Sequence, residues 1–144
     1  MSIILRHASL KEIHLLYNQL PEFDAYHSLN DMEMRIADKP HLVRIAEIDG
    51  ELAGFKLGYA LDKNCFYSWL GGVLPGFRRE GVAHALLRDQ ELWAQSQGYS
   101  RVSVNTRNRF KEMLLLLVSR DYQLVALQPG ETAAEHKLRL EKAL

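Results

Sequence analysis

The sequence predicts one domain of the mixed α/β class, in which helices cover a single sheet. With 144 residues, the chain is long enough for one hydrophobic core and too short for two comfortable domains. Stretches in which apolar and polar residues alternate are interleaved with stretches in which apolar residues recur every three or four positions. The predicted order of elements over residues 1–144 is therefore β-α-α-β-β-β-α-β-α-β-β.

The predicted elements are bounded by local signals. The strands are expected over residues 3–6, 41–48, 51–61, 66–73, 101–105, 122–127 and 136–140. The helices are expected over residues 10–20, 29–37, 82–97 and 109–120. Ser9 and Glu12 form a capping box that begins the first helix, and Pro21 ends it. Asp49-Gly50 joins the second and third strands in a tight hairpin.

The second half of the chain carries the most apolar elements. Residues 66–73 form a nearly continuous apolar run, which is typical of a strand buried on both faces at the centre of a sheet. Gly98 follows the third helix as a C-terminal cap. Asn108 is expected to cap the fourth helix. That helix, over residues 109–120, is expected to be among the most buried because of its leucines.

The connection within residues 73–87 indicates a phosphate-binding turn. Pro75 ends the strand because it has no N–H to give to a neighbour. Gly81 leaves the backbone open to close approach, and Arg78 and Arg79 lie just before the helix. The N-terminus of a helix presents unpaired N–H groups and the positive end of the helix dipole, so it favours phosphate-like anions.

The same residues resemble a family motif. Arg78-x-x-Gly81-x-Ala83, preceded by Val73-x-Pro75, resembles the Q/R-x-x-G-x-G/A motif of the GNAT family of N-acetyltransferases. The resemblance implies the GNAT acyl-CoA N-acyltransferase fold with a splayed central sheet. It also implies acetyl-CoA as cosubstrate, with the pyrophosphate at this turn and the pantetheine arm along the central strand. The implied cofactor-binding residues are Gly71, Gly72, Val73, Arg78, Arg79, Glu80, Gly81, Val82, Ala83, His84, Asn105 and Asn108.

The usual acid–base pair of that family is missing. Acetyl transfer requires a deprotonated amine and a stabilised oxyanion, and the leaving thiolate benefits from a proton donor. The family often uses a strand glutamate as base and a helix tyrosine as acid. Here the strand over residues 65–73 has no carboxylate, and leucines fill residues 115–117 where the tyrosine would fall. Tyr67 and Tyr122 are the substitute catalytic candidates, and backbone N–H groups near residues 70–73 are the candidate oxyanion donors.

Other reactive residues give weaker indications. The loop after the first helix would lie over the acceptor pocket in that fold, so Glu22, Asp24 and His27 are further candidates there. Cys65 would need a depressed pKa and a partnering base to relay an acyl group, and the sequence shows neither. The six histidines are scattered without metal-ligand spacing, so we expect no metal.

Composition limits the partners and the compartment. The 18 basic and 18 acidic residues balance, so no overall charge attracts nucleic acid or a membrane. The basic residues expected near the turn are Arg78, Arg79, Arg107, Arg109 and Lys111. A single cysteine excludes an intrachain disulfide and favours a reducing compartment. The start does not read as a signal peptide, and no apolar run reaches about 18 residues, so we expect a cytoplasmic protein.

These observations predict an acetyl-CoA-dependent N-acetyltransferase that acts on a primary amine of a small molecule, peptide or protein, with a homodimer possible. The alternative is a non-catalytic acyl-CoA-binding or sensing domain of the same fold, which the missing acid–base pair favours. A nucleotide-binding domain of another kind is disfavoured, because the chain has neither a G-x-G-x-x-G nor a G-x-x-x-x-G-K-[ST] pattern.

Overall fold

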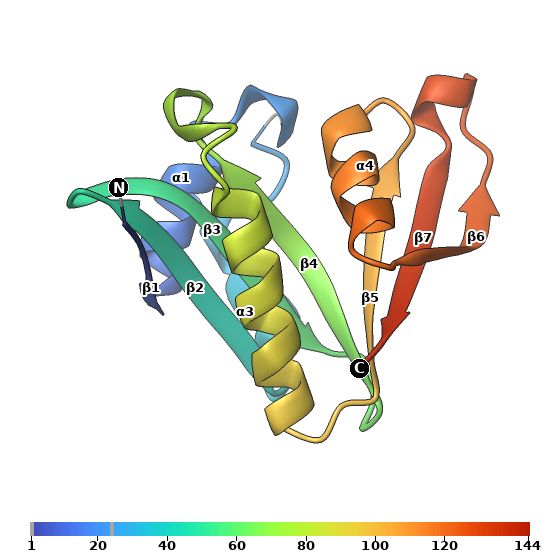
Figure 1. The fold of residues 1–144 in the computed structure, drawn as a ribbon, viewed down its shortest axis with the longest axis horizontal. Helices are drawn as coiled ribbons and strands as arrows, with labels where there is room; N and C mark the ends of the chain where they lie inside the picture. Colours follow the sequence, from blue (N-terminus) through green and yellow to red (C-terminus); the bar gives the residue numbers. More distant parts are fainter. Residues whose placement is uncertain (1, 24) are drawn as a thin grey trace.

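The computed structural model describes residues 2–23 and 25–144 and contains a mixed seven-stranded sheet (Figure 1). The strand order is β1-β2-β3-β4-β5-β7-β6. Neighbouring strands are antiparallel except β4 and β5, which run parallel. The predicted mixed α/β fold is confirmed, together with the predicted order of its strands and helices.

The strands are β1 (Ile3–His7), β2 (His41–Ile48), β3 (Glu51–Ala60), β4 (Cys65–Val73), β5 (Arg101–Arg107), β6 (Gln123–Gln128) and β7 (Lys137–Ala143). The α-helices are α1 (Leu10–Tyr17), α2 (Leu29–Ile36), α3 (Val82–Ser96) and α4 (Lys111–Ser119). Short 3₁₀ turns are η1 (Pro21–Phe23), η2 (Pro75–Phe77) and η3 (Ala133–Glu135). None of the helices that the structure describes is long and apolar enough to cross a bilayer.

Two helix predictions need correction. The first helix ends at Tyr17 and not at residue 20, because Pro21 disfavours the helical conformation in the residue before it. The fourth helix is not among the most buried elements. Only Leu117 of that helix is buried, whereas Leu115 is 70% and Val118 58% exposed, because α4 covers the sheet with one face alone.

Hydrophobic clusters form on both faces of the sheet. On one face, α1 and α2 pack against β2, β3 and β4 through a cluster that includes Leu16, Phe55 and Leu70. On the other face, α3 and α4 share a second cluster, in which Leu87 of α3 and Leu117 of α4 meet residues of β5 and β7. We call these the α1–α2 face and the α3–α4 face.

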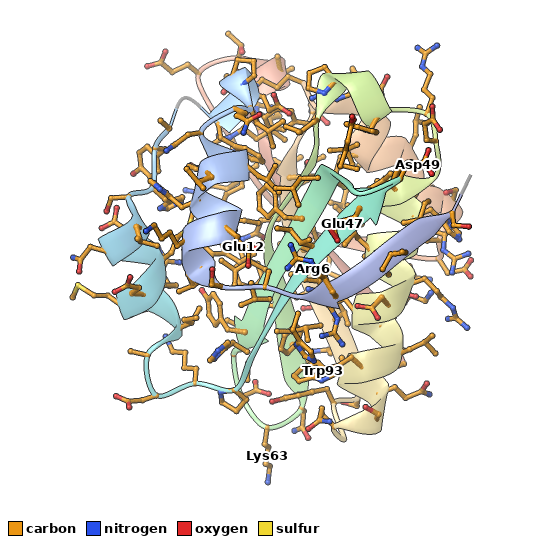
Figure 2. The ribbon with its side chains drawn as sticks, turned by 90° about the vertical axis from the view of Figure 1, so that its left-hand side faces the viewer. Arg6, Glu12, Glu47, Asp49, Lys63 and Trp93 are labelled. Atoms are coloured by element: carbon orange, nitrogen blue, oxygen red, sulfur yellow. The ribbon has the colours of Figure 1, made fainter. Side chains whose placement is uncertain are left out.

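An ion-pair group fixes the first edge of the sheet. Arg6 of β1 donates to Glu12 of α1 at 2.8 Å and to Glu47 of β2 at 3.2 Å, and Figure 2 shows the three side chains together. Glu12 also completes the predicted capping box with Ser9. The arrangement holds α1 against the edge of the sheet from which the chain starts.

Candidate active site

The central strands β4 and β5 separate partway along their length. They pair from Cys65 and Arg101 as far as Ser68 and Val104, and diverge beyond this point (Figure 1). The register between β3 and β4 shifts here, so that Trp69 is an extra residue that forms a β-bulge in β4. The splayed centre implied by the resemblance is therefore present.

Backbone donors of β4 line this separation. The Leu74 N–H donates to the Ala53 carbonyl of β3 at 2.8 Å. Because alternate residues of a strand turn their backbone groups to opposite edges, Gly71 and Val73 direct their N–H groups away from β3 and towards the separated β5. These two N–H groups correspond to the oxyanion donors expected near residues 70–73.

The paired glycines of β4 serve different purposes. A Cβ on Gly72 would collide with Leu20 and press on Phe23, so this glycine allows packing on the α1–α2 face. A Cβ on Gly71 would instead lie 3.1 Å from the Lys56 ammonium nitrogen. Both glycines therefore make room for side chains of the protein itself, Leu20 and Phe23 at Gly72 and Lys56 at Gly71.

The N-terminus of α3 is open, as its glycine predicted. Gly81 is the N-cap residue, with φ of +84° and no side-chain cap. Apart from its two chain neighbours, no described residue has an atom within 4 Å of the position its Cβ would take. Arg79 also has a positive φ of +64°. The first-turn N–H groups of Val82, Ala83 and His84 thus face an unobstructed space beside the end of β4. This geometry suits a phosphate group.

The arginines at this turn differ in their contacts. Arg78 donates to Glu22 at 2.8 Å and to the Val73 carbonyl at 3.1 Å, so its guanidinium is already bound to the protein. Arg79 is exposed and makes no hydrogen bond or ion pair with any residue that the structure describes. Glu80 is exposed at the same turn. Arg79 is therefore the better placed of the two arginines for a phosphate.

The wider basic cluster is also partly neutralised. Arg107 and Arg109 lie 3.9 and 3.4 Å from the carboxylate of Glu135, the last residue of η3. Asn108 donates to the Ala133 carbonyl at 2.9 Å and does not cap α4, whose N-cap is Phe110. The loop before α4 is thus tied to the loop before β7.

These contacts predict a difference in salt dependence. We expect CoA affinity to fall as ionic strength rises, and Arg79→Gln to flatten that slope, because a surface contact with phosphate is screened over about 8–10 Å at physiological salt. Arg78→Gln, the matched control, should change the slope less because Glu22 already neutralises Arg78. Calorimetric titrations at several salt concentrations measure this. Equal slopes in the parent protein and Arg79→Gln would exclude the contact.

Tyr67 and Asn105 meet where the strands separate. The Asn105 amide of β5 donates to the Tyr67 hydroxyl of β4 at 3.0 Å. The Tyr67 ring stands edge-on to Tyr59 at 5.4 Å, which places it on the α1–α2 face. Burial raises the pKa of Tyr67, so this phenol stays protonated at neutral pH. The side chain of Asn105, a predicted cofactor-binding residue, thus orients a tyrosine on the opposite face from α3.

An open cavity of about 460 Å³ adjoins the bulge on the same face. It is lined by Tyr26, His27, Asp31, Met34, Arg35 and Lys39. Its His27 ring stands edge-on to Trp69 at 4.9 Å, and its Arg35 guanidinium lies 4.6 Å from the Trp69 ring. Burial, with a smaller effect of Arg35, lowers the pKa of His27, so the imidazole is neutral at pH 7 and can accept a proton.

The other loop candidates are less suited to catalysis. Glu22 is held by Arg78, and Asp24 lies outside the described residues. Burial raises the pKa of Cys65, which argues against a thiolate relay. The described residues include no group of three or more His, Cys, Asp or Glu side chains that could hold a metal ion.

The placement of Tyr122 does not support its predicted role as a proton donor. The residue is 3% exposed, and its hydroxyl donates to Glu91 of α3 at 3.0 Å. Glu91 is itself 2% exposed and also accepts from Lys142 of β7 at 3.1 Å. Burial and the Glu91 charge raise the pKa of Tyr122 far above its usual value. Tyr122 therefore forms part of a buried polar network that joins α3 to the C-terminal strands.

Comparison with known proteins identifies the family. The family model described as the acetyltransferase (GNAT) family matches residues 8–113, which is more than half of the chain. The chain belongs to the GNAT family. An acetyltransferase of Sodalis glossinidius is 26% identical to this GNAT protein over 125 residues, which cover 84% of the chain and 85% of the relative.

Solved structures share the fold of this GNAT protein. The Ard1 protein of Thermoplasma volcanium superposes with a TM-score of 0.83 at 17% identity, with 100% of this chain and 99% of that chain covered. A GNAT acetyltransferase of Elizabethkingia anophelis, solved with acetyl-CoA bound, gives 0.75 at 17% identity, with coverage of 99% and 98%. The ribosomal-protein-S18-alanine N-acetyltransferase of Escherichia coli gives 0.82 at 14% identity, with coverage of 99% and 94%.

Proposed function

We propose that this GNAT acetyltransferase takes its acetyl group from acetyl-CoA and transfers it to a primary amine of a small molecule, peptide or protein. The observation that carries the proposal is that a site for an extended ligand arm continues directly into a site for a phosphate. The unpaired edge of β4, beyond Ser68, leads through η2 directly into the uncapped N-terminus of α3. An extended arm along β4 and a phosphate at α3 would then belong to one ligand. The acetyl-CoA bound to the Elizabethkingia anophelis protein of the same fold supports this choice.

The chain's own residues support direct transfer within a ternary complex. The N–H groups of Gly71 and Val73 are placed to stabilise an oxyanion, and backbone donors need no particular side chain. The two faces of the separation also differ, since α3 begins on one face while Tyr67, Trp69 and His27 lie on the other. A cofactor and an amine could therefore approach the same point from opposite sides. Holding the two together supplies much of the rate enhancement.

The aromatic and basic residues of the α1–α2 face fit an amine acceptor that arrives neutral. With no carboxylate on β4, the rate at subsaturating amine should rise with pH towards the amine pKa. His27, a neutral imidazole beside Trp69, is the loop residue best suited to accept the amine proton. Tyr67 is placed to contact the amine, because its hydroxyl lies on this face.

A thiol-release assay with acetyl-CoA and a panel of amines, polyamines, amino acids and peptides tests the proposal. We expect release that depends on one class of amine. The alternative, a non-catalytic acyl-CoA-binding domain, is favoured by the absence of a β4 carboxylate and of a tyrosine in α4. Tight CoA binding without amine-dependent release across the panel would establish that alternative.

A further inference from the structure

One buried lysine reaches the separation from the α3–α4 face. Lys56 of β3 lies opposite Gly71 of β4 and is 7% exposed. The position of a Cβ on Gly71 would be 3.1 Å from the Lys56 ammonium nitrogen and 3.7 Å from its Cδ atom. The Lys56 side chain thus extends over β4 at Gly71, the glycine of β4 that faces α3, whereas Gly72 faces Leu20 and Phe23. Its ammonium group lies beside Gly71, whose N–H group is directed into the separation.

The Lys56 ammonium makes no hydrogen bond or ion pair with any of the described residues. The neighbouring buried Ser68 hydroxyl and both polar atoms of the Gln90 amide also have no partner in the described part of the chain. Gln90 of α3 lies over Gly58 of β3, which pairs with Ser68. The Ser68 and Gln90 atoms are fully enclosed, whereas the Lys56 ammonium lies over Gly71 at the edge of the separation. An ammonium without a protein partner at this position can meet a polar group of a ligand that enters between β4 and β5.

The surroundings of Lys56 explain why its ammonium group gives up a proton more readily than an exposed lysine does. Its cross-strand neighbour on β2 is Arg44, which donates to Asp89 of α3 at 2.9 Å. Glu91 of α3 raises the pKa of Lys56, but that carboxylate already binds Tyr122 and Lys142. Burial is the stronger effect and lowers the pKa of Lys56 to about 8. The group is therefore largely an ammonium at pH 7 that gives up its proton readily.

We propose that Lys56 donates a proton to the thiolate that leaves during acetyl transfer. This inference rests on the proposed function. The amine nitrogen forms a bond to the acetyl carbon while the carbon–sulfur bond breaks, and the Lys56 ammonium protonates the sulfur to give free thiol. The attacking amine loses one proton to water or to a base, and water reprotonates Lys56. Protons and charge then balance over one turnover.

The geometry favours Lys56 over the tyrosines for this role. The thiolate belongs to the ligand whose phosphates α3 would hold, and Lys56 lies on the face that α3 covers. Tyr67 lies on the opposite face, and the Tyr122 proton is engaged by Glu91. A general acid works best when its pKa lies near the operating pH, and a thiol titrates at about 8.5. Lys56 therefore provides a proton donor in place of the helix tyrosine, which α4 lacks because leucines occupy that region.

The kinetic test compares Lys56→Met with Lys63→Met, a lysine at the exposed β3–β4 turn (Figure 2). We expect Lys56→Met to lower kcat about 100-fold, as is typical for loss of a general acid, while CoA affinity stays within about threefold. Lys63→Met should match the parent in both. At saturating amine the parent kcat should fall as pH rises above about 8, and the rise of the rate at subsaturating amine should level off there. Lys56→Arg, which keeps the charge but does not titrate in this range, should lose activity as Met does. Full activity in either Lys56 variant would overturn the proposal.

A binding measurement separates this inference from the proposed function. The ¹³C-labelled Lys56 Cε resonance should shift when CoA is added and stay unchanged with adenosine 3′,5′-bisphosphate, which lacks the pantetheine arm. The same response to both ligands, or to neither, would overturn the placement of Lys56 beside the thiol. A parent protein that shows the selective shift but transfers no acetyl group to any amine would refute the proposed function, and the proton-donor role with it. A catalytically active parent without the shift would refute the inference alone.

Discussion

Gly81→Asp should lower CoA affinity by at least about 100-fold, because a like charge placed against phosphates costs several kcal/mol and each 1.4 kcal/mol is tenfold in affinity. The Asp side chain would accept hydrogen bonds from the first-turn N–H groups of α3 and so occupy the anion site itself. Folding should suffer less. The space around the Gly81 Cβ is empty, and the φ of +84° adds only about 1–2 kcal/mol of strain.

Gly81→Asn is the matched control for that variant. Asn has the same shape, caps a helix equally well and tolerates a positive φ, but it carries no charge. We expect calorimetric CoA affinity to fall much less with Asn than with Asp, while the two thermal midpoints remain similar. Equal affinity in Gly81→Asp and the parent protein would exclude this turn as the phosphate site.

Glu91→Ala should destabilise the fold by about 3–5 kcal/mol, the usual cost of removing one partner from a buried ionic group. The Glu91 carboxylate is 2% exposed and accepts from Tyr122 and Lys142, and Arg88 and Arg120 lie within 3.7 and 3.9 Å. Without it, the Tyr122 hydroxyl loses its acceptor and the Lys142 ammonium, 17% exposed, loses its nearest anion. α3 would then be anchored less firmly to β7.

Urea unfolding of Glu91→Ala and of Glu112→Ala tests this expectation. Glu112 is an exposed carboxylate in the first turn of α4, and its removal should change the free energy of unfolding by less than about 1 kcal/mol. Tyr122→Phe should lie between the two, because it removes one hydrogen bond and leaves the ion pair. Glu91→Ala with the stability of the parent would show that the buried network contributes nothing.

The sequence predicted the features that depend on neighbours along the chain. Asp49-Gly50 gave the hairpin between β2 and β3, where both residues have positive φ, and Gly98 follows α3 with φ of +94°. The turn at Gly81 could be recognised from the sequence because a glycine at this position allows a positive φ. It also leaves the space next to the N-terminus of α3 free of a side chain. The resemblance to the GNAT family added the separation of β4 from β5, which local pattern alone does not reveal.

Contacts between distant segments could not be predicted in this way. Nothing near Arg78 indicates that Glu22 neutralises it, because 56 positions separate the two residues. The sequence offered Tyr122 as a candidate proton donor, and only the fold shows that its hydroxyl donates to Glu91 of α3. Lys56 lies in β3, and nothing in its local sequence indicates that this lysine would be buried. Lys56 is buried because Gly71 on β4 leaves room for its side chain and because α3 covers both strands.

The central claim is that this chain transfers an acetyl group directly from acetyl-CoA to an amine. The most direct measurement uses acetyl-CoA labelled with ¹³C in the acetyl carbonyl, together with the amines that give thiol release. Mass spectrometry then follows the label in both the amine and the protein. Our account predicts a labelled N-acetyl amide formed in equal amount with free thiol, and no label on the protein. Label retained on the protein as an acyl intermediate, or bound acetyl-CoA that labels no amine, would contradict it.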